Sequence, residues 1–157
     1  MTEEPSHAHP NATRDSDRRF TLLCLIPGIT ATLTFELFLG HRHDYSGHFA
    51  AGYGASLVAG LLFLKNLPST ASQTSRRRWI VPLCVIFIGL GVLTEATIFR
   101  IACFDVVDFC NQSLGAVLAA CLFPAYATKS NPNSSAFEAG IIIGAVFLGA
   151  GGVLAVA

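Results

Sequence analysis

Five apolar blocks constrain what this chain can fold into more than any other feature of its sequence. They cover residues 20–40, 46–64, 79–99, 105–127 and 137–157. Each block is about 20 residues long, which is the length of helix that crosses a bilayer. Hydrophobic residues make up 52% of the chain and charged residues only 13%, a composition unusual for a soluble domain. The sequence therefore predicts an all-α, polytopic transmembrane helix bundle with about five spans.

The segment before the first block has a different composition. Residues 1–19 contain two prolines, three arginines and four acidic residues, so we expect a disordered cytoplasmic tail. The block that follows is as long as a full span and has no clear small-residue cleavage site, which argues against a cleavable signal peptide. The predicted organisation is thus a tail over 1–19 and a transmembrane helical domain over 20–157.

Two local signals refine the first and last blocks. Pro27 and Gly28 lie in the middle of the first block and predict a kink there. Ser135 and Glu138 have the spacing of a capping box at the start of the last helix. The last block is rich in glycine, which indicates close helix packing.

The distribution of basic residues predicts how the bundle is oriented. Five spans place eight of the ten lysines and arginines on one side: three in the tail, four between 65 and 78, and Lys129. Only Arg42 and Arg100 fall on the other side. The positive-inside rule then puts the N-terminus in the cytoplasm and the C-terminus outside. The net charge of zero gives no basic signal for binding nucleic acid.

This orientation gathers the polar residues of four helices at one depth, near the extracytoplasmic face. They are Glu36, His41, His43, Asp44, His48, Glu95, Arg100, Asp105, Asp108, Asn111 and Gln112. Ionisable residues inside spans are costly and tend to face a cavity or a partner. We interpret Glu36, Glu95 and Asp108 in this way, because they lie a turn or more inside. For His41 and Arg42, a position at a helix end, in the water of the headgroup layer, explains the polar side chain without a functional role.

Spacing sharpens the prediction of a polar site. Asp44 and His48 are four residues apart, so the carboxylate can orient the imidazole and raise its basicity. Asp108 shares one helix face with Asp105, Gln112 and Gly115. Arg100 is the natural counter-ion for Asp105, Asp108 or Glu95. The alternative is a buried salt-bridge network that only fixes helix packing.

At these residues the chain resembles the VanZ-like family of small bacterial membrane proteins. Asp44 and His48 match the family's Asp-Lys-x-x-His pattern, with a tyrosine in the lysine position. Glu95 matches a later glutamate, and Arg100 and Asp108 match an arginine and an aspartate that follow it. The resemblance extends over about residues 20–125.

The last conserved span of the family carries an Asp-x-x-x-Asn-x-x-Gly pattern. Here Asp108 and Gly115 keep the seven-residue separation, and Gln112 occupies the asparagine position. The resemblance implies a multi-pass protein of the bacterial inner membrane with a role in the cell envelope, in a family that includes a protein linked to teicoplanin resistance. It implies no general biochemical activity. A lipid or cell-envelope molecule is the ligand that we consider for the polar site.

Three functions remain as alternatives. The first is a non-catalytic envelope protein whose site consists of Asp44, His48, Glu95, Arg100 and Asp108. The second is a membrane enzyme acting on a lipid or lipid-linked substrate, with Asp44 and His48 as general base and Arg100 as anion anchor. No motif for a nucleophile or a nucleotide loop accompanies these residues, so the sequence leaves catalysis undecided.

The third alternative is a zinc site. Its ligands would be His41, His43, Asp44 and His48, with Glu36 or Glu95. The histidines lie in a short loop, and nothing fixes their spacing as a known zinc motif does. We therefore expect neither a metal nor another cofactor.

Overall fold

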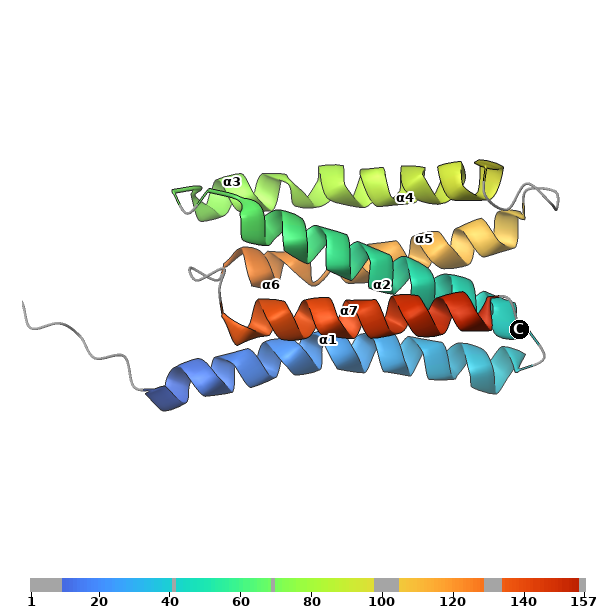
Figure 1. Ribbon diagram of the computed structural model, residues 1–157, viewed down its shortest axis with the longest axis horizontal. Helices are drawn as coiled ribbons and strands as arrows, with labels where there is room; N and C mark the ends of the chain where they lie inside the picture. The colour runs from blue at the N-terminus through green and yellow to red at the C-terminus, as the bar shows by residue number, and fades with distance from the viewer. Residues whose placement is uncertain (1–9, 41, 69, 98–104, 129–133, 156–157) are drawn as a thin grey trace, which may run out of the picture.

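Every regular element in the described residues is a helix, which confirms the predicted all-α class. A computed structural model describes residues 10–40, 42–68, 70–97, 105–128 and 134–155. The helices are α1 (Pro10–Leu39), α2 (His43–Asn66), α3 (Gln73–Arg78), α4 (Ile80–Thr97), α5 (Val106–Ala120), α6 (Phe123–Ala127) and α7 (Ser135–Leu154). The long helices lie side by side and alternate in direction along the chain (Figure 1).

Four of these helical segments are long and apolar enough to cross a membrane. They cover Asp15–Leu39, His43–Asn66, Val106–Ala127 and Ser135–Leu154. The predicted third span corresponds to α4, whose 18 residues are about 27 Å long. It lies beside the others without being one of the four (Figure 1). The count of five spans and the cytoplasmic N-terminus remain predictions.

The second half of the predicted disordered tail is helical. α1 begins at Pro10, ten residues before the predicted span, and continues through Pro27 without interruption. Proline suits the first turn of a helix, where its missing N–H leaves no bond unmade. Further along, the Thr21 hydroxyl donates to the Asp17 carbonyl oxygen at 3.0 Å, and the Asp17 carboxylate accepts from the Ser135 hydroxyl of α7. The expectation for residues 1–9 lies outside the described residues.

One other local prediction needs correction. The capping box does not form, because Ser134 is the N-cap of α7 and Ser135 uses its hydroxyl on Asp17. The fourth predicted span agrees with the apolar segment Val106–Ala127, in which Cys121–Leu122 separates α5 from α6. Pro124 in the first turn of α6 explains the division, because it lacks the N–H that a continuous helix would need.

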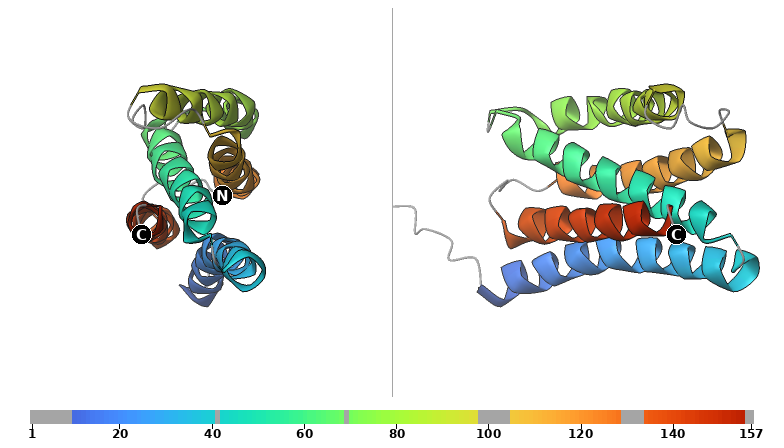
Figure 2. Two further views of the ribbon diagram at one scale, coloured as in Figure 1. Left: turned by 90° about the vertical axis from the view of Figure 1, so that its right-hand side faces the viewer. Right: turned by 45° about the vertical axis from the view of Figure 1, so that its right-hand side comes forward.

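α2 occupies the centre of the bundle, between α7 and α5 (Figure 2). Glycines let the helix backbones meet. A Cβ atom on Gly54 would overlap the backbone of α7 at Gly144 and Leu148. A Cβ on Gly115 of α5 would overlap the backbone of α2 at Phe49. Gly115 thus has the packing role that the sequence suggested.

The core contains an unusual number of aromatic rings around α2. Tyr53 is fully buried, its ring packs edge-on against Phe147 at 5.1 Å between centroids, and its hydroxyl donates to the Cys24 carbonyl oxygen at 2.5 Å.

The outside of the bundle is also apolar: Leu37 and Phe38 of α1 are each at least 80% exposed. A soluble monomer rarely exposes so much apolar surface, whereas lipid would cover it.

Candidate functional site

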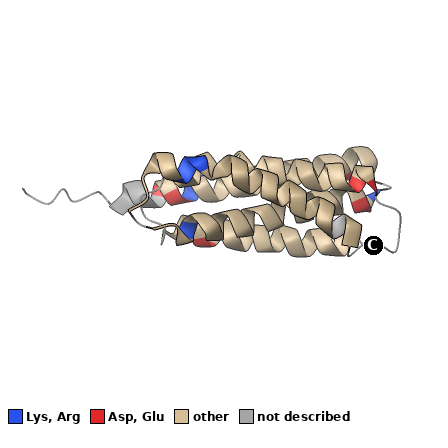
Figure 3. Ribbon diagram, turned by 90° about the horizontal axis from the view of Figure 1, so that it is seen from above, with Lys and Arg blue, Asp and Glu red and all other residues tan. Residues whose placement is uncertain are grey.

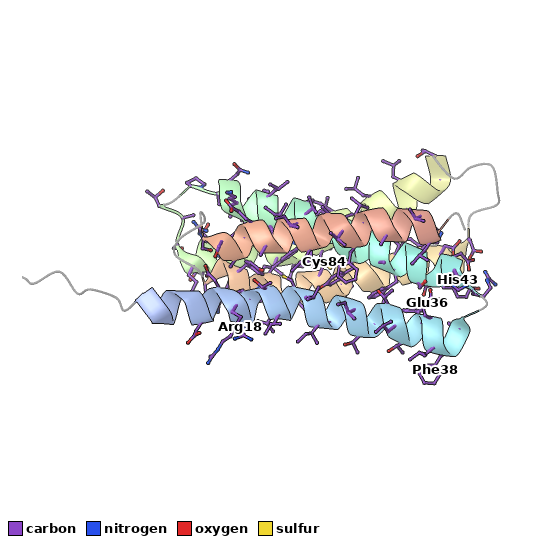
Figure 4. The ribbon with its side chains drawn as sticks, turned by 60° about the horizontal axis from the view of Figure 1, so that its bottom comes forward. Arg18, Glu36, Phe38, His43 and Cys84 are labelled. Atoms are coloured by element: carbon purple, nitrogen blue, oxygen red, sulfur yellow. The ribbon has the colours of Figure 1, made fainter. Side chains whose placement is uncertain are left out.

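Charged side chains gather at the two ends of the bundle and leave its middle uncharged (Figure 3). One end contains the last turn of α1 and the first turns of α2 and α5. We call it the polar end and define it by Glu36, Arg42, His43, Asp44, Ser46, His48 and Asp108. Figure 4 shows Glu36 and His43 next to each other there, with Arg18 toward the opposite end of α1.

Asp44 pairs with Arg42 rather than with His48. The Arg42 guanidinium donates to both carboxylate oxygens, from Nε at 3.2 Å and from Nη2 at 2.9 Å. It also lies 4.0 Å from the centre of the Tyr45 ring. The hydrogen bonds with Asp44 raise the pKa of Arg42, and the charge of Asp108 adds to the shift. The carboxylate of the predicted Asp44–His48 base is thus paired with Arg42, and the role of the two residues as a base stays a prediction.

His48 instead faces Asp108 on α5. The two side chains are 12% and 17% exposed, and Nε2 of His48 lies 3.5 Å from one carboxylate oxygen of Asp108. They meet because α2 and α5 cross closely at Gly52 and Gly115. The other carboxylate oxygen of Asp108, Oδ1, is buried and has no hydrogen-bond partner among the described residues. Burying an acceptor in this way costs about 1–3 kcal/mol.

Glu36, His43 and Ser46 form a second polar group where α1 meets α2. Glu36 accepts from the Ser46 hydroxyl through one carboxylate oxygen and lies 2.7 Å from Nδ1 of His43 through the other. The carboxylate is thus between the serine and the histidine. A serine nucleophile needs the histidine in the middle, as the base that takes its proton. The group therefore joins α1 to α2, and its order differs from that of a Ser-His-acid triad.

The remaining predicted residues divide into two groups. Asp105 is the N-cap of α5, where its carboxylate accepts from the backbone N–H groups of Val107 and Asp108 at 2.7 and 3.3 Å. Its charge is used in capping, so it adds no free group to the site. Glu95 belongs to α4, but its side chain lies outside the described part of the structure, as do His41 and Arg100.

Sequence reasoning did not anticipate the roles of Arg42 and Ser46. Arg42 was interpreted as a loop residue, although its two-residue separation from Asp44 was a usable signal.

Within the described ranges, no group of three or more His, Cys, Asp or Glu side chains is placed to hold a metal ion. Comparisons of the chain with protein-family models, with curated proteins and with solved structures gave no match.

Proposed function

We propose that this protein is a non-catalytic membrane protein that binds the headgroup of a cell-envelope amphiphile at its polar end. The observation that supports this proposal is the buried, unpartnered Oδ1 of Asp108 beside His48. A carboxylate oxygen in such a position accepts a hydrogen bond from a ligand at little further desolvation cost, because it has already left water. The ligand is therefore an amphiphile whose headgroup carries N–H donors, such as a primary ammonium.

The geometry favours binding over catalysis. The carboxylate of the predicted base pairs with Arg42, and the Ser46 hydroxyl donates to the Glu36 carboxylate rather than to a histidine. An envelope enzyme acting on a lipid-linked substrate was the alternative, and no arrangement among the described side chains favours it. The resemblance to the VanZ-like family supports the envelope role, including a contribution to glycopeptide resistance.

We further propose five spans in the bacterial inner membrane, with the polar end on the extracytoplasmic side. The described basic residues of the opposite end support this orientation: Arg18, Arg19, Lys65, Arg76, Arg77 and Arg78. Among the described residues, the polar end contains a single lysine or arginine, which is Arg42. The positive-inside rule assigns the more basic end to the cytoplasm.

Cysteine labelling tests the orientation. His43→Cys and Arg77→Cys place thiols at opposite ends of the bundle, at exposed positions. In intact cells, a membrane-impermeant maleimide is expected to label His43→Cys and to label Arg77→Cys only after the cells are opened. The unmodified chain gives the baseline from its own five cysteines. Labelling of Arg77→Cys in intact cells, with His43→Cys protected, would reverse the topology.

Lipid binding tests the function. Phosphatidylethanolamine carries an ammonium with N–H donors, whereas the quaternary ammonium of phosphatidylcholine has none. In native mass spectrometry of the purified protein, we expect about a tenfold preference for phosphatidylethanolamine, the size of one hydrogen bond to a charged group. Asp108→Asn is expected to abolish the preference.

Glu138→Gln is the matched control, since it removes an exposed carboxylate at the other end of the bundle. It should leave the preference unchanged. Equal binding of the two lipids by the wild-type protein, or an unchanged preference in Asp108→Asn, contradicts the proposal.

A further inference from the structure

A cavity of about 260 Å³ lies between α2, α4 and α5. Its wall on α2 consists of small residues, Gly52, Ala55, Ser56 and Ala59, whose spacing puts them on one helix face. Phe87 and Leu90 of α4 and Gln112 and Ala116 of α5 complete the lining. The lining is almost wholly apolar, and it extends about 10 Å along α2 from Gly52 to Ala59.

The cavity continues directly from the polar end. α2 and α5 run in the same direction (Figure 1), so residues further along one helix lie at the same depth as residues further along the other. His48 and Asp108 face each other. One turn further along each helix are Gly52 and Gln112, which are in backbone contact and line the cavity. A molecule with its headgroup at Asp108 therefore has an apolar space beginning one turn, about 5.4 Å, deeper.

The cavity also opens at the side of the bundle. Ala55 and Ala59 line it and are exposed, and Leu90 across from them on α4 is 48% exposed. Charged residues colour only the two ends of the bundle (Figure 3), so in a membrane the residues around this opening would face lipid tails. A hydrocarbon chain can enter here from the bilayer without crossing water or a charged layer.

We propose that this cavity binds one acyl chain of the lipid whose ammonium headgroup donates a hydrogen bond to Asp108. The inference rests on the proposed function, because the headgroup defines which lipid enters. Shape supports the occupant: four small residues on α2 leave a narrow cavity, and the surfaces facing it are hydrocarbon except for Gln112. The ligand class is thus an amino-headgroup phospholipid held at two points, by its ammonium group and by a single chain.

Two cavity-filling variants test the proposal. Ala59→Phe fills the channel from α2, and Leu90→Trp fills it from α4; both positions are exposed, so neither larger side chain has to enter the packed core. Leu62→Phe is the control, because Leu62 is 42% exposed on α2 and does not line the cavity. The probe is phosphatidylethanolamine in native mass spectrometry, with thermal unfolding as the check on folding.

We expect the two filling variants to lower retention of phosphatidylethanolamine at least fivefold, with Leu62→Phe close to wild type. If both variants fold and bind as well as wild type while Asp108→Asn has lost binding, the acyl-chain site is wrong and the headgroup site stands. If Asp108→Asn also binds normally, both proposals fail. A wild-type dimer that Ala59→Phe and Leu90→Trp convert to monomer would identify the cavity as a contact between two copies instead, and would overturn the lipid proposal.

Discussion

Gly54→Ala is expected to destabilise the protein strongly. The new Cβ would overlap backbone atoms of Gly144 and Leu148 on α7, and a packed backbone cannot rotate away as a side chain can. Overpacking of this kind costs about 1–3 kcal/mol or more, which corresponds to a melting temperature lower by about 2–12 °C. Circular dichroism during heating in a mild detergent measures the change.

Gly149→Ala is the matched control for this variant. Gly149 lies on α7 itself, and a Cβ there would meet no atom within 4 Å. Alanine also favours a helix over glycine by up to about 1 kcal/mol. We therefore expect a melting temperature equal to or slightly above wild type. Similar melting temperatures for Gly54→Ala and Gly149→Ala would mean that α2 and α7 do not pack as described.

Asp108→Leu is expected to stabilise the protein while removing its binding activity. The substitution removes a carboxylate oxygen that has no partner among the described residues and puts a side chain suited to an apolar helix interface in its place. It also removes the contact with His48, which offsets part of the gain. The gain is at most about 1–3 kcal/mol, or a melting temperature higher by roughly 2–12 °C. Preference for phosphatidylethanolamine should disappear in the same preparation. Such opposite effects are typical of residues kept for a ligand rather than for folding.

Asp105→Ala provides the contrast, three residues away on the same helix. The Asp105 carboxylate is already satisfied by two backbone N–H groups, so its loss should cost about 1 kcal/mol. The two acidic residues are therefore expected to shift the melting temperature in opposite directions. If Asp108→Leu lowers the melting temperature as Asp105→Ala does, Asp108 is a structural residue and the buried salt-bridge interpretation is correct.

Hydropathy predicted the helices well because burial in lipid depends on composition and length, which a sequence contains directly. The predicted span 46–64 lies within α2, and 137–157 overlaps most of α7. The helical start of α1 at Pro10 was missed, because polar composition alone does not stop a helix that a long apolar segment has already nucleated.

The partners within the site were harder to predict. The four-residue spacing of Asp44 and His48 indicates a shared face, but a shared face does not specify a partner. Arg42 takes Asp44 because the chain folds back at the start of α2, and Asp108 reaches His48 through a glycine crossing that joins residues 60 positions apart. The cavity was not predictable either, since it depends on the position of α4 relative to α2.

The central position of α2 has a consequence for the order of assembly. In its most apolar stretch, 61% of the residues are buried, against 11% in α1. α2 is the second of the described long helices along the chain, and α7, which covers one of its glycine faces, follows the others. During synthesis that face is therefore exposed to lipid or to the insertion machinery until α7 is made. Termination before α7 leaves this face of α2 uncovered, although α5 and α1 still pack against its other sides.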